Sequence, residues 1–269
     1  MSEPPVLTPL SEATDADRYG GKAAQLAAAL AHALPVPGGF ALDWEAADAT
    51  ASGNVPAACA DLAAGPWAVR SSAIGEDSEG ASFAGAHLTV LGCVGAAGVL
   101  DGVRQVHASA SEPAALAYRE RLHIDQRPRM AVVLQAMIDA DVAGVLFTRN
   151  PVTGADERVI EASWGLGESV VSGAVTPDQW RLDGAGRLLE HVPGEKDTAL
   201  RLRADGGVEE VAISGDRVTA PCLSPEELTW LHRLALSCDQ AYGDQGHDIE
   251  FAIAHGRLHL LQRRPITSG

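Results

Sequence analysis

Apolar and polar positions along the chain follow two periods, one typical of helices and one typical of strands. Helical spacing marks "GGKAAQLAAALAHAL", from about Gly21, and "SPEELTWLHRLALSCDQAYG", where Ser224 is a predicted N-cap with Glu227 three residues on. Strand-like runs include "WAVRSSA", "RMAVVLQAMI", "VAGVLFTRNP" and "ERVIEASW", and "DQWRLD" is expected to pair with "GRLLEHV" in an antiparallel arrangement. This mixture predicts an α+β fold.

The end of the chain, "DIEFAIAHGRLHLLQRRPI", alternates apolar and polar residues on both sides of a short turn, which predicts a β-hairpin. Residues two apart in a strand point to the same face, so Asp248 and Glu250 share a face, as do Gln262 and Arg264. A turn at His255 and Gly256 would place Glu250 nearly opposite Gln262.

A polar turn, "DGAGR", and the charged segment that follows "GRLLEHV" suggest a boundary between two lobes near residue 183. We therefore expect an N-terminal lobe at residues 1–182, with a glycine-rich loop, and a C-terminal lobe at residues 183–269, with the closing hairpin.

Charge and cysteine content narrow the functional class. The net charge of −16 argues against a protein that binds nucleic acid or an anionic membrane surface. No stretch has the length of a membrane helix, and the N-terminus does not resemble a signal peptide. The four cysteines form no CxxC pair and are expected to be small buried residues in a reducing compartment, so we expect a cytoplasmic protein.

The loop "SSAIGEDSEGASFAG" follows the strand that ends near Arg70 and combines glycines with serines. Glycine lets backbone N–H groups approach an anion, serine adds a hydroxyl donor, and arginine supplies a planar cation that suits phosphate. Ser71 and Gly85 are candidates for phosphate contact in this loop. A flexible surface loop of no further role is the alternative interpretation.

Lys22 follows two glycines at the start of the first predicted helix. A helix N-terminus favours anions, so a lysine there gains nothing from the helix dipole and needs another reason for its position.

The polar residues of the closing hairpin also need an explanation. A carboxylate beside an amide oxygen suits Mg²⁺, which takes few protein ligands together with phosphate oxygens. The alternative is a solvent-exposed strand face with a Glu250–Arg264 salt bridge.

Taken together and in order, several segments resemble one protein family. The segments are "GGKAAQL…VPGGFAL", "WAVRSSAIGEDSEGASFAG", "GVLFTRNP", "IEASWGLGESVVSGAVTPDQW" and "DIEFAI…LLQRRP". They are similar to the ATP-binding domain of phosphoenolpyruvate synthase, pyruvate phosphate dikinase and rifampin phosphotransferase. The resemblance covers essentially the whole chain and implies an ATP-grasp-like fold whose two lobes enclose a nucleotide cleft, with ATP and Mg²⁺ as cofactors.

The resemblance also implies roles for individual residues. Lys22, Arg70 and Arg264 match family residues that contact the phosphates and act in catalysis, whereas Glu250 and Gln262 match residues that hold Mg²⁺, with Asp248 in the same motif. Less directly, Gln135, Met137 and Glu161 fall in regions that line the nucleotide pocket.

Family members carry a mobile domain whose histidine, in a motif such as TxGGxxSHAA or TSGGxTxHAA, accepts phosphate from ATP. The nine histidines of this sequence lie in other contexts. The resemblance therefore implies an ATP-cleaving phosphotransferase component, with AMP as a product, whose acceptor histidine lies on another polypeptide or a missing part. Two alternatives stay open: a stand-alone small-molecule kinase or ATP-grasp ligase, and a nucleotide-binding module without turnover.

Overall fold

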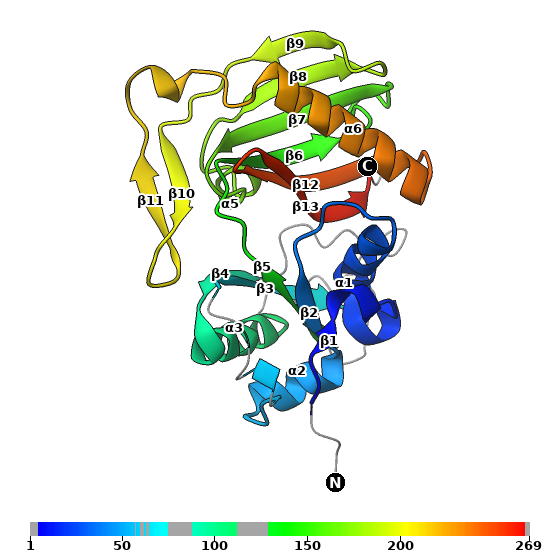
Figure 1. Ribbon diagram of the computed structural model, residues 1–269, viewed down its shortest axis with the longest axis vertical. Helices are drawn as coiled ribbons and strands as arrows, with labels where there is room; N and C mark the ends of the chain where they lie inside the picture. Colours follow the sequence, from blue (N-terminus) through cyan, green and yellow to red (C-terminus); the bar gives the residue numbers. More distant parts are fainter. Residues whose placement is uncertain are drawn as a thin grey trace. The chain divides into compact units, whose positions relative to one another are not determined.

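A computed structural model describes residues 5–56, 58–59, 62, 65–74, 88–111 and 129–266 (Figure 1). Helices and largely antiparallel sheets are both present, so the predicted α+β class is confirmed. None of the helices in these ranges is long and apolar enough to cross a membrane.

The chain divides into two compact units. Unit 1 comprises Met1–Ala31, Pro37–Met137 and Ala204–Gly207, and unit 2 comprises His32–Val36, Ile138–Arg203 and Val208–Gly269. The boundary expected near residue 183 does not coincide with this division. Asp183 is the last residue of a strand that is paired on both sides within one sheet of unit 2, so the chain cannot be divided there without breaking that sheet.

Unit 1 contains a five-stranded sheet in the order β1-β2-β5-β3-β4. Its elements are β1 (Thr8–Pro9), η1 (Leu10–Glu12), α1 (Ala16–Ala31), β2 (Gly39–Leu42), α2 (Trp44–Ala51), β3 (Trp67–Ala73), β4 (Thr89–Cys93), α3 (Gly95–Ser109) and β5 (Met130–Ala136). Apolar side chains of β3 and β5, such as Val69 and Leu134, pack with α2 and α3 in one hydrophobic core. The strands predicted around "WAVRSSA" and "RMAVVLQAMI" are thereby confirmed.

Unit 2 contains a six-stranded sheet in the order β13-β12-β6-β7-β8-β9 and a separate hairpin of β10 and β11. Its elements are β6 (Val142–Phe147), β7 (Glu157–Trp164), α5 (Glu168–Val171), β8 (Asp178–Asp183), β9 (Leu188–Val192), β10 (Thr198–Leu202), β11 (Val208–Ala212), η3 (Gly215–Val218), α6 (Pro225–Tyr242), β12 (His247–Ala254) and β13 (Arg257–Pro265). The predicted antiparallel pairing of β8 with β9 is confirmed.

Helix α6 lies along one face of the six-stranded sheet (Figure 1). It begins as predicted: the Ser224 hydroxyl accepts a hydrogen bond from the Glu227 N–H, and the Glu227 carboxylate accepts one from the Ser224 N–H at 2.7 Å. Apolar residues of the sheet, including Ile249, Leu146 and Ile160, alternate with residues on the opposite face and are fully buried. The face without α6 carries Glu250 of β12 and Glu161 of β7.

Three features differ from the sequence prediction or lie beyond it. The helix expected from about Gly21 begins earlier, at Ala16, and is interrupted at Gly20. Helix α2 and the β10–β11 hairpin lie in segments whose pattern was too weak to predict an element. Most of the glycine-rich loop, residues 75–85, lies outside the described residues.

Candidate functional site

A break in α1 determines where Lys22 lies. Gly20 has a φ of 79°, and a Cβ there would come within 2.2 Å of the Ser72 carbonyl oxygen, so only glycine fits. The Ser72 hydroxyl donates to the Tyr19 carbonyl at 2.7 Å and accepts from the Ala23 N–H at 3.1 Å. Ser72 thus holds the two parts of α1 against β3.

Two cations are buried in this part of unit 1. The Lys22 ammonium is 4% exposed and donates to the Ser71 carbonyl at 2.5 Å. The Arg70 guanidinium, 7% exposed, donates to Oε1 of Gln135 at 2.9 Å. A buried cation is stable only when it is hydrogen-bonded or paired, and these contacts hold both groups in fixed positions. The structure therefore brings Lys22, Arg70, Ser71 and Gln135 together.

Three further candidates belong to unit 1: Ser71, Met137 and Gly85. Because β3 alternates, the side chains of Ser71 and Arg70 point to opposite faces of the sheet, and Ser71 meets Lys22 through its carbonyl. Met137 follows the end of β5, where its N–H donates to the Pro66 carbonyl at 3.0 Å. Gly85 lies outside the described residues.

The closing hairpin of unit 2 has the predicted geometry. His255 and Gly256 both have positive φ, 49° and 68°, which is the conformation of a two-residue type I′ turn. The register pairs Glu250 with Gln262 and Asp248 with Arg264. Directly opposed residues share a face with Cβ atoms about 5 Å apart, so all four side chains lie on one face. Arg264 stands directly opposite Asp248, and Gln262 is buried.

This face holds a carboxylate in an unfavourable environment. Burial and the adjacent Glu250 carboxylate raise the pKa of Asp248 to about 6, and Arg264 only partly opposes the rise. Oδ1 of Asp248 is buried and accepts no hydrogen bond from any described residue. Two carboxylates and an amide oxygen that face each other in this way form a donor set suited to a hard divalent cation.

The six-stranded sheet extends this polar face to β7 and β8. Val145 pairs with Glu250 on one side and with Glu161 on the other, and Glu161 pairs with Gln179. Gln179 donates to Oε1 of Glu161 at 2.9 Å. Strands are about 4.8 Å apart, so Glu161 lies about 10 Å from Glu250 along the same row.

Sequence reasoning did not single out Gln179. Its alternation with Trp180 in "DQWRLD" is a local signal, but only the strand order places it beside Glu161.

The candidate residues thus form two groups, one in each unit. Lys22, Arg70, Ser71, Gln135 and Met137 belong to unit 1, and Glu161, Asp248, Glu250, Gln262 and Arg264 belong to unit 2. No group of three or more histidine, cysteine, aspartate or glutamate side chains in the described ranges could hold a metal ion. That finding excludes a zinc-type cluster there but is compatible with Mg²⁺, which commonly uses one or two carboxylates plus phosphate oxygens.

Comparison with known proteins identifies the class as a nucleotide-binding domain of phosphotransferases. The chain belongs to the family of the pyruvate phosphate dikinase AMP/ATP-binding domain, whose sequence model matches residues 50–269. The family resemblance predicted from the ordered motifs is thereby confirmed.

Several named relatives are similar to this chain over most of its length. The chain is 44% identical over 203 residues to a probable phosphoenolpyruvate synthase of Methanothermobacter thermautotrophicus, covering 75% of this chain and 29% of the relative. It is 39% identical over 284 residues to the prodigiosin synthesizing transferase PigC of Serratia marcescens, covering 93% and 32%. It is 37% identical over 204 residues to the rifampicin phosphotransferase of Streptomyces sviceus, covering 75% and 23%. The chain therefore spans less than a third of the length of these relatives.

Among solved structures, the chain overlaps with D-alanine–D-alanine ligase from Bacillus anthracis at 10% identity and a TM-score of 0.36, covering 92% of this chain and 60% of that one. The ATP-grasp ligase PsnB overlaps at 13% identity and a TM-score of 0.32, covering 90% and 51%. We draw no functional conclusion from overlaps at this level.

Proposed function

We propose that the chain is the Mg-ATP-binding component of a phosphotransferase. It cleaves ATP to AMP; one of the two phosphoryl groups passes to a histidine domain on another polypeptide or another part of the protein, and the other is released to water as phosphate. The observation that carries the proposal is the register of β12 and β13, which sets Asp248, Glu250, Gln262 and Arg264 on one face of a chain that belongs to an AMP/ATP-binding family.

The cations would bind the triphosphate. Lys22 and Arg70 are buried, and they are held by the Ser71 carbonyl and the Gln135 side-chain amide, respectively. Little reorganisation of these cations would therefore accompany the development of negative charge during transfer. Arg264 would add a third cation beside the carboxylates of the hairpin. Phosphoryl transfer requires mainly positioning and charge neutralisation, which these three residues can supply.

Asp248, Glu250 and Gln262 would hold Mg²⁺. The raised pKa of Asp248 and its buried, unbonded Oδ1 fit this role, because a bound dication would relieve the repulsion between the two carboxylates. When bound, the cation would neutralise phosphate charge and orient the phosphates. We assign contacts with the nucleoside to Gln135, Met137 and Glu161. Gln179 would orient the Glu161 carboxylate through its hydrogen bond.

Replacing the charge at Glu250 tests the proposal. We expect Glu250→Gln to fold normally and to lose Mg²⁺-dependent ATP cleavage, because a neutral amide holds the dication poorly. Glu190→Gln, an exposed carboxylate on β9 of the same sheet, is the matched control and should retain activity. Cleavage by Glu250→Gln at the wild-type rate would remove Glu250 from the metal site.

Product analysis tests the type of reaction. With labelled ATP, AMP without ADP supports transfer of the family type, whereas ADP as the only nucleotide product supports a simple kinase or a ligase.

A second candidate function has one observation in its favour. The relative named prodigiosin synthesizing transferase aligns with 93% of this chain, more than the 75% that aligns with the phosphoenolpyruvate synthase relative. In this alternative the chain activates a small molecule in the synthesis of a natural product. Candidate small acids and alcohols incubated with the chain and Mg-ATP would then become phosphorylated without any histidine-bearing protein.

A further inference from the structure

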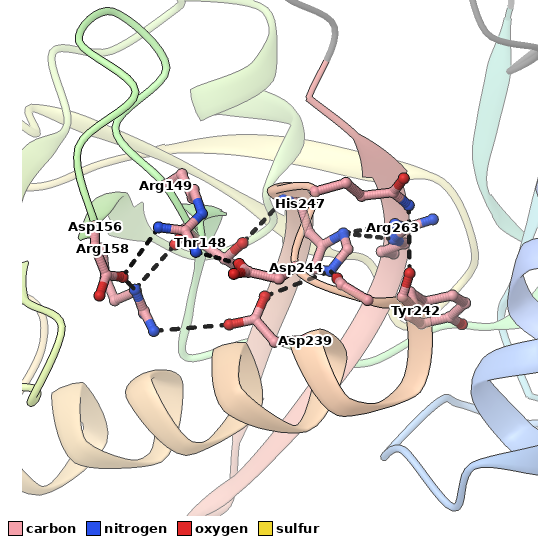
Figure 2. Close-up of polar contacts among 11 residues, drawn as sticks. Thr148, Arg149, Asp156, Arg158, Asp239, Tyr242, Asp244, His247 and Arg263 are labelled. Atoms are coloured by element: carbon pink, nitrogen blue, oxygen red, sulfur yellow. Dashed lines mark hydrogen bonds and ion pairs between the residues drawn. The ribbon is translucent and has the colours of Figure 1, made fainter.

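A second polar network lies on the reverse side of the proposed metal strand. His247 and Arg263 precede Asp248 and Arg264 directly, so their side chains point to the opposite face, toward α6. Both are buried, at 0% and 3% exposure. The network is shown in Figure 2 and includes the end of α6, residues of β7, β12 and β13, and Thr148, which directly follows β6.

Arg263 is held on several sides in this network. Its Nε donates to Nδ1 of His247 at 3.1 Å, and its Nη2 lies 2.5 Å from the same nitrogen. Its guanidinium lies over the Tyr242 ring, 4.2 Å from the centroid. The other ring nitrogen of His247 lies 2.9 Å from the Gly243 carbonyl, so it carries the proton and donates while Nδ1 accepts. The last turn of α6 is thereby joined to both strands.

His247 is also fixed to the neighbouring strand through its backbone. Its N–H donates to the Thr148 hydroxyl at 2.8 Å, and its carbonyl accepts from the Thr148 N–H at 2.9 Å. The Thr148 carbonyl in turn accepts from Nη1 of Arg158 at 3.1 Å. Asp239 of α6 lies between Arg158 and His247, at 3.7 and 3.5 Å. The position of His247 is therefore well determined by residues outside the hairpin.

The hairpin needs such an anchor because its register changes. Between the Glu250 and Phe251 pairs β13 contains one extra residue, Leu261, since Phe251 pairs with Leu260 and Glu250 with Gln262. A shift of one residue after this bulge would turn Gln262 and Arg264 to the other face. Turn geometry fixes the register only as far as the bulge, because the type I′ turn lies on its other side.

We propose that Arg263 is a positioning residue that fixes the register of β13 beyond the bulge by its contacts with His247 and Tyr242. It thereby holds Gln262 and Arg264 opposite Glu250 and Asp248. This inference rests on the proposed function, because it concerns the geometry of the proposed metal and phosphate ligands. It adds to that function a residue whose side chain points away from them.

Arg263→Lys tests this role, because lysine retains the charge and loses the planar fork and the stacking. The matched control is Arg257→Lys, an exposed arginine on the same strand before the bulge. Calorimetric titration would measure the affinity for adenosine and for a non-hydrolysable imido analogue of ATP, the latter with Mg²⁺ and with EDTA. We expect Arg263→Lys to weaken the Mg²⁺-dependent affinity at least tenfold, about 1.4 kcal/mol, and to bind adenosine within twofold of wild type.

Hydrogen exchange gives a readout that does not depend on ligand. We expect the amides of residues 262–264 to exchange faster in Arg263→Lys, with residues 257–260 unchanged. Arg257→Lys should match wild type in both experiments. If Arg263→Lys does not fold, Arg263→Met takes its place, because it leaves no unpaired charge in the interior.

The outcomes separate this inference from the function on which it rests. If Glu250→Gln loses Mg²⁺-dependent affinity while Arg263→Lys binds and exchanges like wild type, the positioning role is overturned and the metal site stands. If Glu250→Gln also binds like wild type, the proposed metal site is overturned, and the positioning role with it. A uniform loss of adenosine and analogue affinity in Arg263→Lys would show a general folding role and overturn the inference as well.

Discussion

At the scale of single residues, the proposed metal face places two like charges side by side. Asp248 and Glu250 lie two residues apart on one strand, and burial of Asp248 adds to the repulsion. A site that binds a dication commonly carries such a cost in its free form, because the ion that offsets the repulsion is not part of the fold. The cost can be measured as a dependence of stability on pH.

We expect Asp248→Asn to be more stable than wild type at neutral pH without Mg²⁺. The pKa of Asp248 is raised in the folded state from 3.8 to about 6, so the unfolded chain loses this proton first. Stability therefore falls as the pH rises from about 4 to about 6, by on the order of 2 to 3 kcal/mol. Urea unfolding of both proteins across this range should show a difference that vanishes below about pH 4.

Asp216→Asn is the control for this experiment, because Asp216 is exposed in η3. It should follow wild type at every pH. A wild-type stability that shows no decline relative to Asp248→Asn across this range would mean that the carboxyl of Asp248 is solvated in solution. The face would then hold no electrostatic repulsion that a bound cation could relieve.

Lys22 permits a second test at this scale. Because the ammonium is buried and its proposed ligand is phosphate, Lys22→Met should weaken ATP binding by about 1.5 to 3 kcal/mol, the range for charge-assisted hydrogen bonds, and leave adenosine binding unchanged. Titration calorimetry with both ligands measures this. Arg18→Met, on the same helix but exposed and paired with Asp43, should change neither affinity. An equal loss for ATP and adenosine would indicate a defect of folding.

At the scale of elements, both groups of candidate residues depend on an irregularity. The break at Gly20 separates α1 into two parts, and Lys22 lies in the first turn of the second part. The bulge in β13 lets Gln262 face Glu250. A regular helix and a regular strand would each rotate these side chains away from their present neighbours, so the irregularities are part of the candidate site.

Gly20→Ala should be strongly destabilising. It combines a positive φ, which costs about 1 to 2 kcal/mol for a residue with a Cβ, with a clash against the Ser72 backbone. Gly53→Ala is the matched control, because Gly53 also has a positive φ but open space around its Cβ position. Thermal unfolding should therefore show a clearly larger loss for Gly20→Ala. Equal losses would mean that the approach of α1 to β3 is not a close one.

At the scale of the whole molecule, the chain has two compact units, each with its own sheet and its own group of candidate residues. The proposed function assigns phosphate contacts to Lys22 and Arg70 of unit 1, and it assigns the metal ligands to the hairpin of unit 2. The transfer step requires in addition an acceptor, which we assign to a histidine domain.

We expect the chain to bind Mg-ATP and to cleave it slowly until a histidine-bearing acceptor domain is added. Water is a poor substitute for a positioned nucleophile, and positioning contributes about 7 to 11 kcal/mol in favourable cases. The measurement is the release of AMP from labelled ATP with and without such a domain, and the transfer of label to it. Variants of the acceptor histidine are the control. Rapid phosphorylation of a small molecule by the chain alone would contradict the partner model.

The sequence by itself determined the features that depend on neighbours along the chain. The hairpin of β12 and β13 follows from alternation on both sides of a two-residue turn, and that turn places Glu250 nearly opposite Gln262. The direct pairing of the two residues depends on the bulge at Leu261. The start of α6 follows from the capping box at Ser224. These features are set by local propensity and short-range hydrogen bonds, which is why a single sequence was enough.

Only the tertiary structure decided which distant segments meet. The row from Glu250 to Glu161 and Gln179 depends on the pairing of β12 with β6, about which the period of either strand says nothing. Long-range packing also decides that the chain passes from unit 1 to unit 2 after Met137. It likewise decides that Arg263 is anchored by Tyr242 of α6. Alternation assigns each side chain to a face, but the strand order and the helix that covers the sheet decide what that face becomes.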